Sequence, residues 1–255
     1  MKLVILGSGT SVPHPQRASS AYWLETAGGT LLLDISPDAA HRMAQENLDW
    51  PGLDAIWVSH FHLDHLGGLA PFLFGTKWAP QLYERKKPLK IFGPGGTRRL
   101  LDIVDQSNRY HLLEQRFSIE VFEVEGGTHF MILPELKAET FSTPHTVESL
   151  ALRLTENDGT SLVYTSDTGY AEELAEFAKG ADLLLMECSF RKDKAVETHL
   201  RLSEAMKLAE LAAAKRVVLT HLYPEWDGVD IEAEARELWS GEVIEATDGL
   251  RLEIG

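Results

Sequence analysis

The chain has 255 residues, of which 44% are hydrophobic and 25% charged, a composition typical of folded globular proteins. An α/β chain of this length often folds around one core, so we expect residues 1–255 to form a single domain. Its 24 Lys and Arg against 39 Asp and Glu give a formal net charge of −15. This charge disfavours long nucleic acids as partners.

The sequence also carries information about cellular location. No apolar run approaches the ~18 residues that a membrane span needs, and the first residues lack the cleavage site of a signal peptide. We therefore expect a cytoplasmic protein without membrane contact. The single cysteine, Cys188, cannot form an internal disulfide, which agrees with a reducing compartment. Because it lies in an apolar stretch, we expect an inert, packed thiol.

The first half of the chain is predicted to begin as a β meander. Short strands separated by Gly, Pro and Ser turns are predicted in 3–6, 7–25, 30–35 and 54–60. Helical periodicity then alternates with strand patterns. The predicted helices are 67–75, 95–106, 171–180 and 202–214, and the predicted strands are 89–93, 118–124, 138–143, 151–155, 161–166, 182–189 and 216–221. This pattern predicts an α/β fold with two mixed sheets covered by helices.

The polar segment 76–90 is the main local exception to the acidic composition, since it contains Arg85, Lys86, Lys87 and Lys90. One interpretation is a solvated loop. The other is a substrate-facing loop whose cations contact phosphate.

The strongest functional signal is the hexapeptide 60–65. It carries His60, His62, Asp64 and His65 between a predicted strand and a Gly-Gly pair that begins a helix. A loop leaving the strand can direct the first two side chains to one side, and the next turn carries the other two to a neighbouring point. Imidazole and carboxylate groups suit zinc, manganese or iron, and the absence of thiolates argues against a purely structural zinc site.

Three later strands each lead into a residue that can bind a metal, namely His145, Asp167 and His221. Strand ends on one side of a sheet sandwich converge in space. These residues could therefore complete two coordination shells together with the hexapeptide.

The segments HFHLDH, STPHT, TSDTG and LTH, in this order, resemble the ligand motifs of the metallo-β-lactamase superfamily. The N-terminal LGSGTSVPHPQRASSAYWLE and the C-terminal helix-strand unit resemble its ribonuclease Z and small phosphodiesterase branch. The resemblance covers nearly the whole chain and implies an αββα sandwich. It also implies two divalent metal ions, for which Zn²⁺ is the first choice and Mn²⁺ or Fe²⁺ are the alternatives. The implied ligands are His60, His62 and His145 for the first metal, Asp64, His65 and His221 for the second, and Asp167 as a bridge.

A pair of divalent ions about 3.5–4 Å apart can share a water and lower its pKa, which supplies a hydroxide at neutral pH. Asp64 could bind metal and also orient this hydroxide. By the resemblance, His199 would give a proton to the leaving group, and Glu187 would orient His199. Residue chemistry alone instead indicates a surface or helix-capping histidine and a hydrogen-bonded structural carboxylate.

Two residues outside the motifs are further candidates. Asp34 ends a predicted strand and would brace a metal ligand. His14 lies in a Pro-His-Pro turn, where it is either an exposed loop histidine or a neighbour of the site mouth.

The chain departs from transfer-RNA-processing ribonuclease Z enzymes at three places. It has DISPD at 34–38, MECS at 186–189 and HLR at 199–201, where those enzymes carry Asp-Cys-Gly-Glu-Gly, His-Glu-Ala-Thr and His-Ser-Thr. It also lacks their Gly-Pro-rich arm. The phosphodiesterase of the carbon-phosphorus lyase pathway has an additional Cys-rich zinc site, which one cysteine cannot supply.

We therefore predict a dinuclear metal-dependent hydrolase, specifically a phosphodiesterase that cleaves a small or nucleotide-like anionic phosphodiester through a metal-bridged hydroxide. The alternatives are a ribonuclease Z-type tRNA 3'-processing endonuclease, and a lactonase or thioesterase that uses the same site. A non-catalytic metal-binding module is disfavoured by the complete ligand set. Since related enzymes are often dimers, the resemblance also implies a homodimer.

Overall fold

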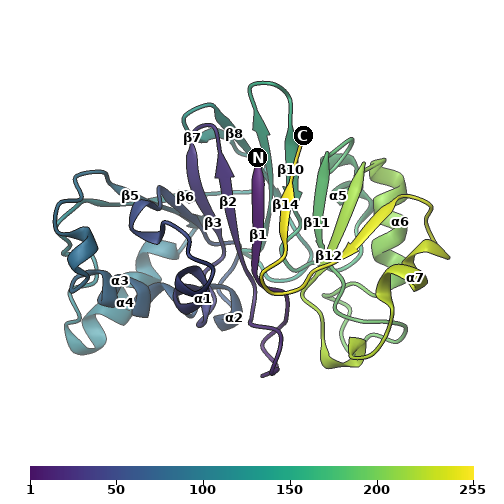
Figure 1. Cartoon of the computed structure of the whole chain (residues 1–255), viewed down its shortest axis with the longest axis horizontal. Coiled ribbons are helices and arrows are strands. Elements are labelled where there is room, and N and C mark those ends of the chain that lie inside the picture. The colour runs from purple at the N-terminus through teal and green to yellow at the C-terminus, as the bar shows by residue number, and fades with distance from the viewer.

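The computed structural model describes residues 1–255 and contains two seven-stranded sheets packed face to face (Figure 1). In spatial order, the first sheet contains β14 (Arg251–Glu253), β1 (Lys2–Gly7), β2 (Ala21–Thr26), β3 (Gly29–Leu33), β4 (Ala55–Trp57), β5 (Leu89–Pro94) and β6 (Ile119–Val124). The second contains β13 (Glu242–Glu245), β12 (Arg216–Thr220), β11 (Leu183–Glu187), β10 (Ser161–Tyr164), β9 (Leu150–Glu156), β8 (Leu136–Ser142) and β7 (His129–Leu133).

Helices cover the outer faces of both sheets (Figure 1). The first sheet is covered by α1 (Ala39–Gln45), α3 (Leu69–Thr76) and α4 (Thr97–Asn108), and the second by α5 (Glu172–Phe177), α6 (Leu202–Ala212) and α7 (Ile231–Arg236). The short α2 (Leu63–Leu66) precedes α3, and 3₁₀ turns occupy Trp50–Gly52, Pro80–Leu82 and Pro224–Trp226. None of the helices combines the length and apolarity that crossing a membrane requires. The predicted α/β sandwich of two mixed sheets is confirmed.

The core has three parts, one between the two sheets and one under the helices of each sheet, because side chains alternate along each strand. In β1, Leu3 and Ile5 pack between the two sheets, whereas Val4 and Leu6 pack under the helices of the first sheet. Strands buried on both faces read as continuous apolar runs. Cys188 belongs to the outer core of the second sheet, where burial raises the pKa of its thiol.

The strand directions bring the chemically distinctive residues to one edge of the sandwich. Strands β3 to β6 are parallel to one another, and so are β10 to β13. Strand β8 is antiparallel to β9, which is antiparallel to β10, so β8 and β10 also run the same way. The carboxyl ends of parallel strands form a common edge, where ligands usually bind in sheets of this kind.

Some elements differ from the sequence-based prediction. Of the predicted strand 7–25, Gly7 belongs to β1 and residues 21–25 belong to β2, whereas residues 8–20 form a long loop with bridges from Gly9 to Ser19 and Leu222. The edge strand β7 was not predicted, because its side chains do not alternate cleanly and Met131 is 51% exposed. Helix α1 was also missed, since it buries only Ala39 and Met43.

The basic segment after α3 is attached to the protein by its own cations. The guanidinium of Arg85 donates hydrogen bonds to the carbonyl oxygens of Pro51 (2.5 Å), Leu53 (2.7 Å) and Pro88 (2.9 Å). Lys87 forms an ion pair with Asp54. Neither side chain is free to contact a phosphate in this conformation.

Candidate metal centre

The hexapeptide 60–65 links the end of β4 to α2. His60 is fully buried, His62 is the N-cap residue of α2, and Asp64 lies in the first turn of this helix. A Cβ atom on Gly68 would lie 2.1 Å from the carbonyl oxygen of Ser36. Glycine at this position therefore lets the chain after α2 pack directly against the segment that follows β3.

Four imidazoles converge on one carboxylate oxygen. Oδ2 of Asp167, just after β10, lies 3.3 Å from Nε2 of His65 and 3.4 Å from Nε2 of His221. It also lies 3.7 Å from Nε2 of His60 and of His145. A carboxylate among four ring nitrogens is the arrangement expected of a ligand shared by two metal ions.

The remaining predicted ligands lie beside this cluster. Nδ1 of His62 is 3.0 Å from Nε2 of His145, and Oδ2 of Asp64 is 3.4 Å from Nε2 of His221. The ligand-capable atoms fall into three groups whose members lie within 4.8 Å of one another: His60, His62, His145 and Asp167; Asp64, His65 and His221; and Asp167, His199 and His221. The first two match the ligand sets that the resemblance implies. Their roles as metal ligands stay a prediction.

Asp34 fixes the orientation of two of the imidazoles. Its Oδ2 accepts hydrogen bonds from Nδ1 of His65 (2.6 Å) and from the hydroxyls of Ser59 (2.7 Å) and Tyr164 (2.6 Å). Because the Ser59 hydroxyl donates to Asp34, it can accept from Nδ1 of His60, 3.0 Å away. Asp34 therefore sets the direction of a chain of hydrogen bonds that ends on the candidate ligands.

A second network holds the other side of the cluster. The hydroxyl of Ser189 donates to Oε2 of Glu187 (2.7 Å), so it can accept from Nδ1 of His221 at 2.9 Å. Nδ1 of His145 donates to the carbonyl oxygen of Thr198 (2.9 Å). In both networks the Nδ1 atom of each histidine makes a hydrogen bond to the surrounding protein, and its Nε2 atom faces the centre.

The ring edges that face the centre fit divalent metal ions. The Nε2 atoms of His60, His65 and His221 are buried and have no hydrogen-bond partner in the protein. Buried polar atoms without partners carry a free-energy cost, which coordination of a metal would remove. Nitrogen and carboxylate donors are the ligands of zinc, manganese and iron sites in hydrolases.

The pKa shifts favour the forms of His60 and Asp64 that bind metal, namely the neutral imidazole and the ionised carboxylate. Burial, together with the charge of His65, lowers the pKa of His60 to about 2, so this imidazole is neutral. Burial opposes ionisation of Asp64, but the nearby imidazoles of His221 and His65 outweigh it and lower its pKa to about 2. Burial lowers the pKa of the His65 imidazole, but the negative charges of Asp167 and Asp34 outweigh it, so the pKa is raised.

Three strand ends at this edge adopt a strained backbone conformation. Asp34, Ser166 and His221 each have a φ angle of 56°, in the left-handed region that non-glycine residues rarely occupy. Such strain is kept where the surrounding structure enforces it, often at functional sites.

Glu187 and His199 form a buried pair beside the cluster. Nδ1 of His199 donates to Oε1 of Glu187 (2.8 Å), and the His199 ring stacks on His221 with centroids 5.3 Å apart. Oε1 also accepts from the backbone N–H of Thr168 (2.8 Å), and Oε2 from that of Leu200 (3.1 Å). Burial lowers the pKa of His199, but Glu187 outweighs it and the pKa is raised. The pair therefore holds a proton next to the candidate ligands.

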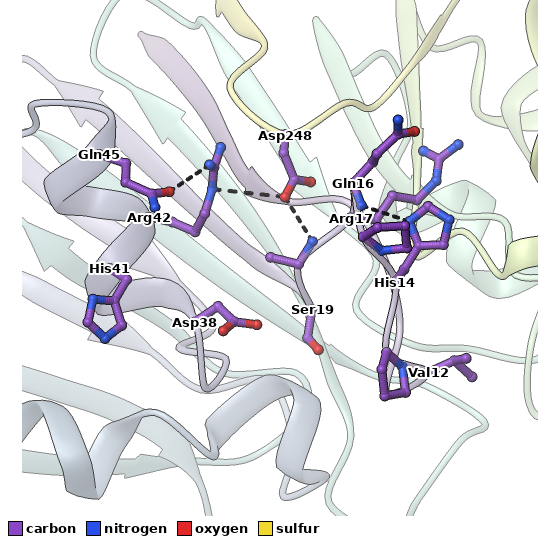
Figure 2. A pocket seen from close by; sticks show the side chains of 13 residues that line it. Val12, His14, Gln16, Arg17, Ser19, Asp38, His41, Arg42, Gln45 and Asp248 are labelled. Carbon is purple, nitrogen blue, oxygen red and sulfur yellow. Dashed lines mark hydrogen bonds and ion pairs between the residues drawn. The ribbon is translucent and has the colours of Figure 1, made fainter.

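A surface cleft of about 570 Å³ lies elsewhere, between the loop of residues 12–19 and α1 (Figure 2). Two of its charged groups are bound within the protein: Asp248 accepts from the N–H of Ala18 (2.8 Å), and Arg42 donates to Gln45 (2.9 Å). His14 lines this cleft and lies 2.9 Å from Asp227 through Nε2. We therefore regard the buried cluster, and not this cleft, as the candidate reaction centre.

Sequence reasoning missed several supporting residues. Ser59 directly precedes His60, and Ser189 follows Glu187 by two residues, so their positions next to motif residues were an available signal. Tyr164 is the last residue of β10 and reads as an ordinary core residue. Only the structure shows its contact with Asp34.

The comparisons with known proteins agree with this geometry. The family model described as anti-Pycsar protein Apyc1 matches residues 1–240. The uncharacterized protein ML1173 of Mycobacterium leprae is 30% identical over 266 residues, covering 100% of this chain and 89% of its own. Ribonuclease Z of Haloferax volcanii is 26% identical, covering 100% of this chain and 95% of its own.

Solved structures show the same fold. The metallo-β-lactamase fold protein YhfI from Bacillus subtilis has a TM-score of 0.83 at 25% identity, with 100% of this chain and 99% of that chain covered. Its curated sequence, named as a probable metallo-hydrolase, is 28% identical, with 98% of each chain covered. A diphosphatase from the PhnP family has a TM-score of 0.76 at 22% identity, covering 100% and 98% of the two chains. The chain therefore belongs to the anti-Pycsar protein Apyc1 family and is a metallo-hydrolase of the metallo-β-lactamase fold.

Proposed function

We propose that the protein is a phosphodiesterase that hydrolyses a small or nucleotide-like phosphodiester at a two-metal centre. The observation that carries this proposal is the Glu187–His199 pair, which lies directly beside the candidate ligands. Breaking a P–O ester bond releases an alkoxide, which needs a proton. A lactonase or thioesterase has less need of such a donor.

The metal ligands in this proposal are His60, His62 and His145 at one position, Asp64, His65 and His221 at the other, and Asp167 between them. Zn²⁺ suits these donors, as do Mn²⁺ and Fe²⁺. When bound, two such ions make a water molecule nucleophilic at neutral pH and offset the negative charge of the transition state.

The protein's own groups orient the reaction. Asp64 holds one oxygen near His221 and can use the other to accept a hydrogen bond from the attacking water. His199 is fixed through Nδ1 by Glu187, so its Nε2 is available to give a proton to the leaving oxygen. The carboxylate of Glu187 also stabilises the protonated imidazole before this transfer.

The net charge of the protein favours a small substrate. The formal net charge of −15 disfavours a long polyanion, whereas a small anion can still approach a metal-loaded centre. Whole-length similarity to ribonuclease Z supports a second candidate, a tRNA 3'-processing endonuclease. Arg85 and Lys87, two of the four cations that suggested phosphate contact, are bound internally, which favours the small substrate.

The test compares hydrolysis of bis-p-nitrophenyl phosphate with hydrolysis of a lactone and a thioester panel, on metal-loaded wild-type protein and His199→Ala. A matched control is His129→Ala, because His129 lies on the edge strand β7 and its side chain is 72% exposed. We expect phosphodiester turnover to dominate and to fall about 10²–10⁴-fold in His199→Ala, as for loss of a general acid, while the control is unchanged.

Metal content must be measured in the same samples, because His199 also lies within 4.8 Å of Asp167 and His221 and could act as a ligand. Retained metal with lost turnover supports the proton donor. Turnover of carbonyl substrates that is indifferent to His199 would instead assign the protein to the lactonase or thioesterase class. Cleavage of a tRNA precursor in preference to bis-p-nitrophenyl phosphate would favour the endonuclease.

A further inference from the structure

A group of stacked aromatic rings borders the candidate metal centre. Tyr223 follows His221 by two residues, and its ring stacks on Phe190 with centroids 5.1 Å apart and an interplanar angle of 18°. The same ring meets His221 edge-on at 6.3 Å, while Phe190 meets His199 edge-on at 6.2 Å. Tyr223 and Phe190 therefore form one group of contacting rings with His199 and His221.

The backbone on both sides of this stack is held in place. The indole N–H of Trp226 donates to the carbonyl oxygen of Cys188 (2.9 Å), and the carboxylate of Glu225 accepts from the backbone N–H of Arg191. These contacts join the turn that contains Tyr223 to the segment that contains Phe190. The tyrosine is thus positioned in advance of substrate binding, which lowers the entropic cost of using it.

The hydroxyl of Tyr223 differs from those of the buried tyrosines. Tyr22 and Tyr164 use their hydroxyls in hydrogen bonds inside the protein. Tyr223 is only half-buried, and unlike those two residues it has no hydrogen bond from its hydroxyl within the protein. The phenol is therefore an unused donor on a ring that meets the His221 ring edge-on.

We propose that Tyr223 is a further catalytic residue, whose hydroxyl donates a hydrogen bond to a non-bridging oxygen of the phosphodiester at the metal centre. The inference rests on the proposed function. Negative charge on these oxygens is stabilised in the transition state by fixed donors. Tyr223 and His199 would thus serve different oxygens of one substrate, the first a phosphoryl oxygen and the second the leaving oxygen.

Tyr223→Phe tests this role, because it removes the hydroxyl and keeps the ring that stacks on Phe190. Tyr110→Phe is the matched control: Tyr110 is 38% exposed, packs on Phe74 beyond the end of α4, and its hydroxyl also has no protein partner. We expect kcat for bis-p-nitrophenyl phosphate to fall about 10- to 100-fold in Tyr223→Phe, somewhat less than loss of an oxyanion-hole donor, with KM changed much less.

A second readout does not depend on turnover. Inorganic phosphate binding to metal-loaded protein, measured by titration calorimetry at matched metal content, should weaken about 3- to 10-fold in Tyr223→Phe, the range of one modest hydrogen bond. Tyr110→Phe should bind phosphate like the wild type.

The outcomes separate the two proposals. Wild-type phosphodiester turnover that Tyr223→Phe retains, with unchanged phosphate affinity, would overturn the role of Tyr223 and leave the proposed function intact. Loss of bound metal in Tyr223→Phe would also overturn it, since the residue would then be structural. Wild-type protein without phosphodiester turnover would overturn the proposed function and this role together.

Discussion

Nε2 of His145 lies 3.0 Å from Nδ1 of His62, although the two side chains come from different sheets. His62 follows β4 of the first sheet, and His145 follows β8 of the second. Asp167 and His221 likewise belong to the second sheet, while His60 and His65 belong to the first. The candidate metal centre therefore joins the two halves of the sandwich at their common edge.

The first prediction concerns stability. Metal bound between the sheets stabilises only the folded protein, so removing it with a chelator should lower the melting temperature. At a free metal concentration of about 100 Kd the loss is about 3 kcal/mol. For a chain of this size that corresponds to a shift of roughly 5–10 °C, measured by circular dichroism or calorimetry.

His62→Ala is the companion measurement, because this side chain is exposed and its loss leaves the buried core intact. Metal content should fall from two ions per chain to about one, and the chelator-dependent shift should shrink. His129→Ala serves as the control with both ions retained. A chelator that removes metal without changing the melting temperature would contradict the idea that the centre joins the sheets.

The second prediction concerns Asp34, which is fully buried and accepts four hydrogen bonds from three residues. In Asp34→Asn the amide N–H₂ must face one of these donors, and His65 loses its charged partner. We expect metal affinity to fall about 10- to 100-fold, as found for supports of metal-binding histidines. The free energy of unfolding of metal-free protein should fall by about 1–3 kcal/mol.

Affinity is measured by competition with a chromophoric chelator, and stability by urea unfolding. Asp38→Asn is the matched control, since Asp38 is exposed and its side chain makes no capping hydrogen bond. If both variants bind metal like the wild type, Asp34 does not position a ligand.

The candidate ligands could be predicted from the sequence because each lies in a short motif or directly after an apolar strand. Their supports could not. Ser59 and Ser189 have the same chemistry as any serine, and their function depends on which neighbour takes the hydroxyl proton. Asp34 decides this for Ser59, and Glu187 decides it for Ser189. The direction of these hydrogen bonds can be inferred only from the atomic positions.

The fold shows a similar division. Strands such as β1 and β12 are apolar on both faces and were predicted within a few residues. The edge strand β7 and the short helix α1 were missed, because tertiary contacts rather than periodicity hold them. The proposed role of Tyr223 had no signal in the sequence, since it depends on stacking with Phe190, which is 33 positions away along the chain.

The third prediction concerns pH and involves Asp182, far from the candidate ligands. Its carboxylate accepts from the N–H of Ser161 (2.8 Å), the hydroxyl of Ser161 (3.1 Å) and Nζ of Lys215 (2.6 Å). Burial opposes ionisation, but the hydrogen bonds from Lys215 and Ser161 outweigh it and lower the pKa of Asp182. The ionised form therefore stabilises the fold where β10 and β11 begin.

A carboxylate whose pKa is lower in the folded state stabilises the protein above its unfolded pKa of about 4, and this contribution is lost as the pH falls through the folded value. Asp182→Asn should therefore cost about 1 kcal/mol at pH 7, because Lys215 is exposed and solvent screens the pair. Below pH 4 the difference from wild type should shrink. Urea unfolding of metal-free protein between pH 3 and 8 measures this, with the exposed Asp193→Asn as control. A difference that stays constant over this range would show that Asp182 acts through packing and not through its charge.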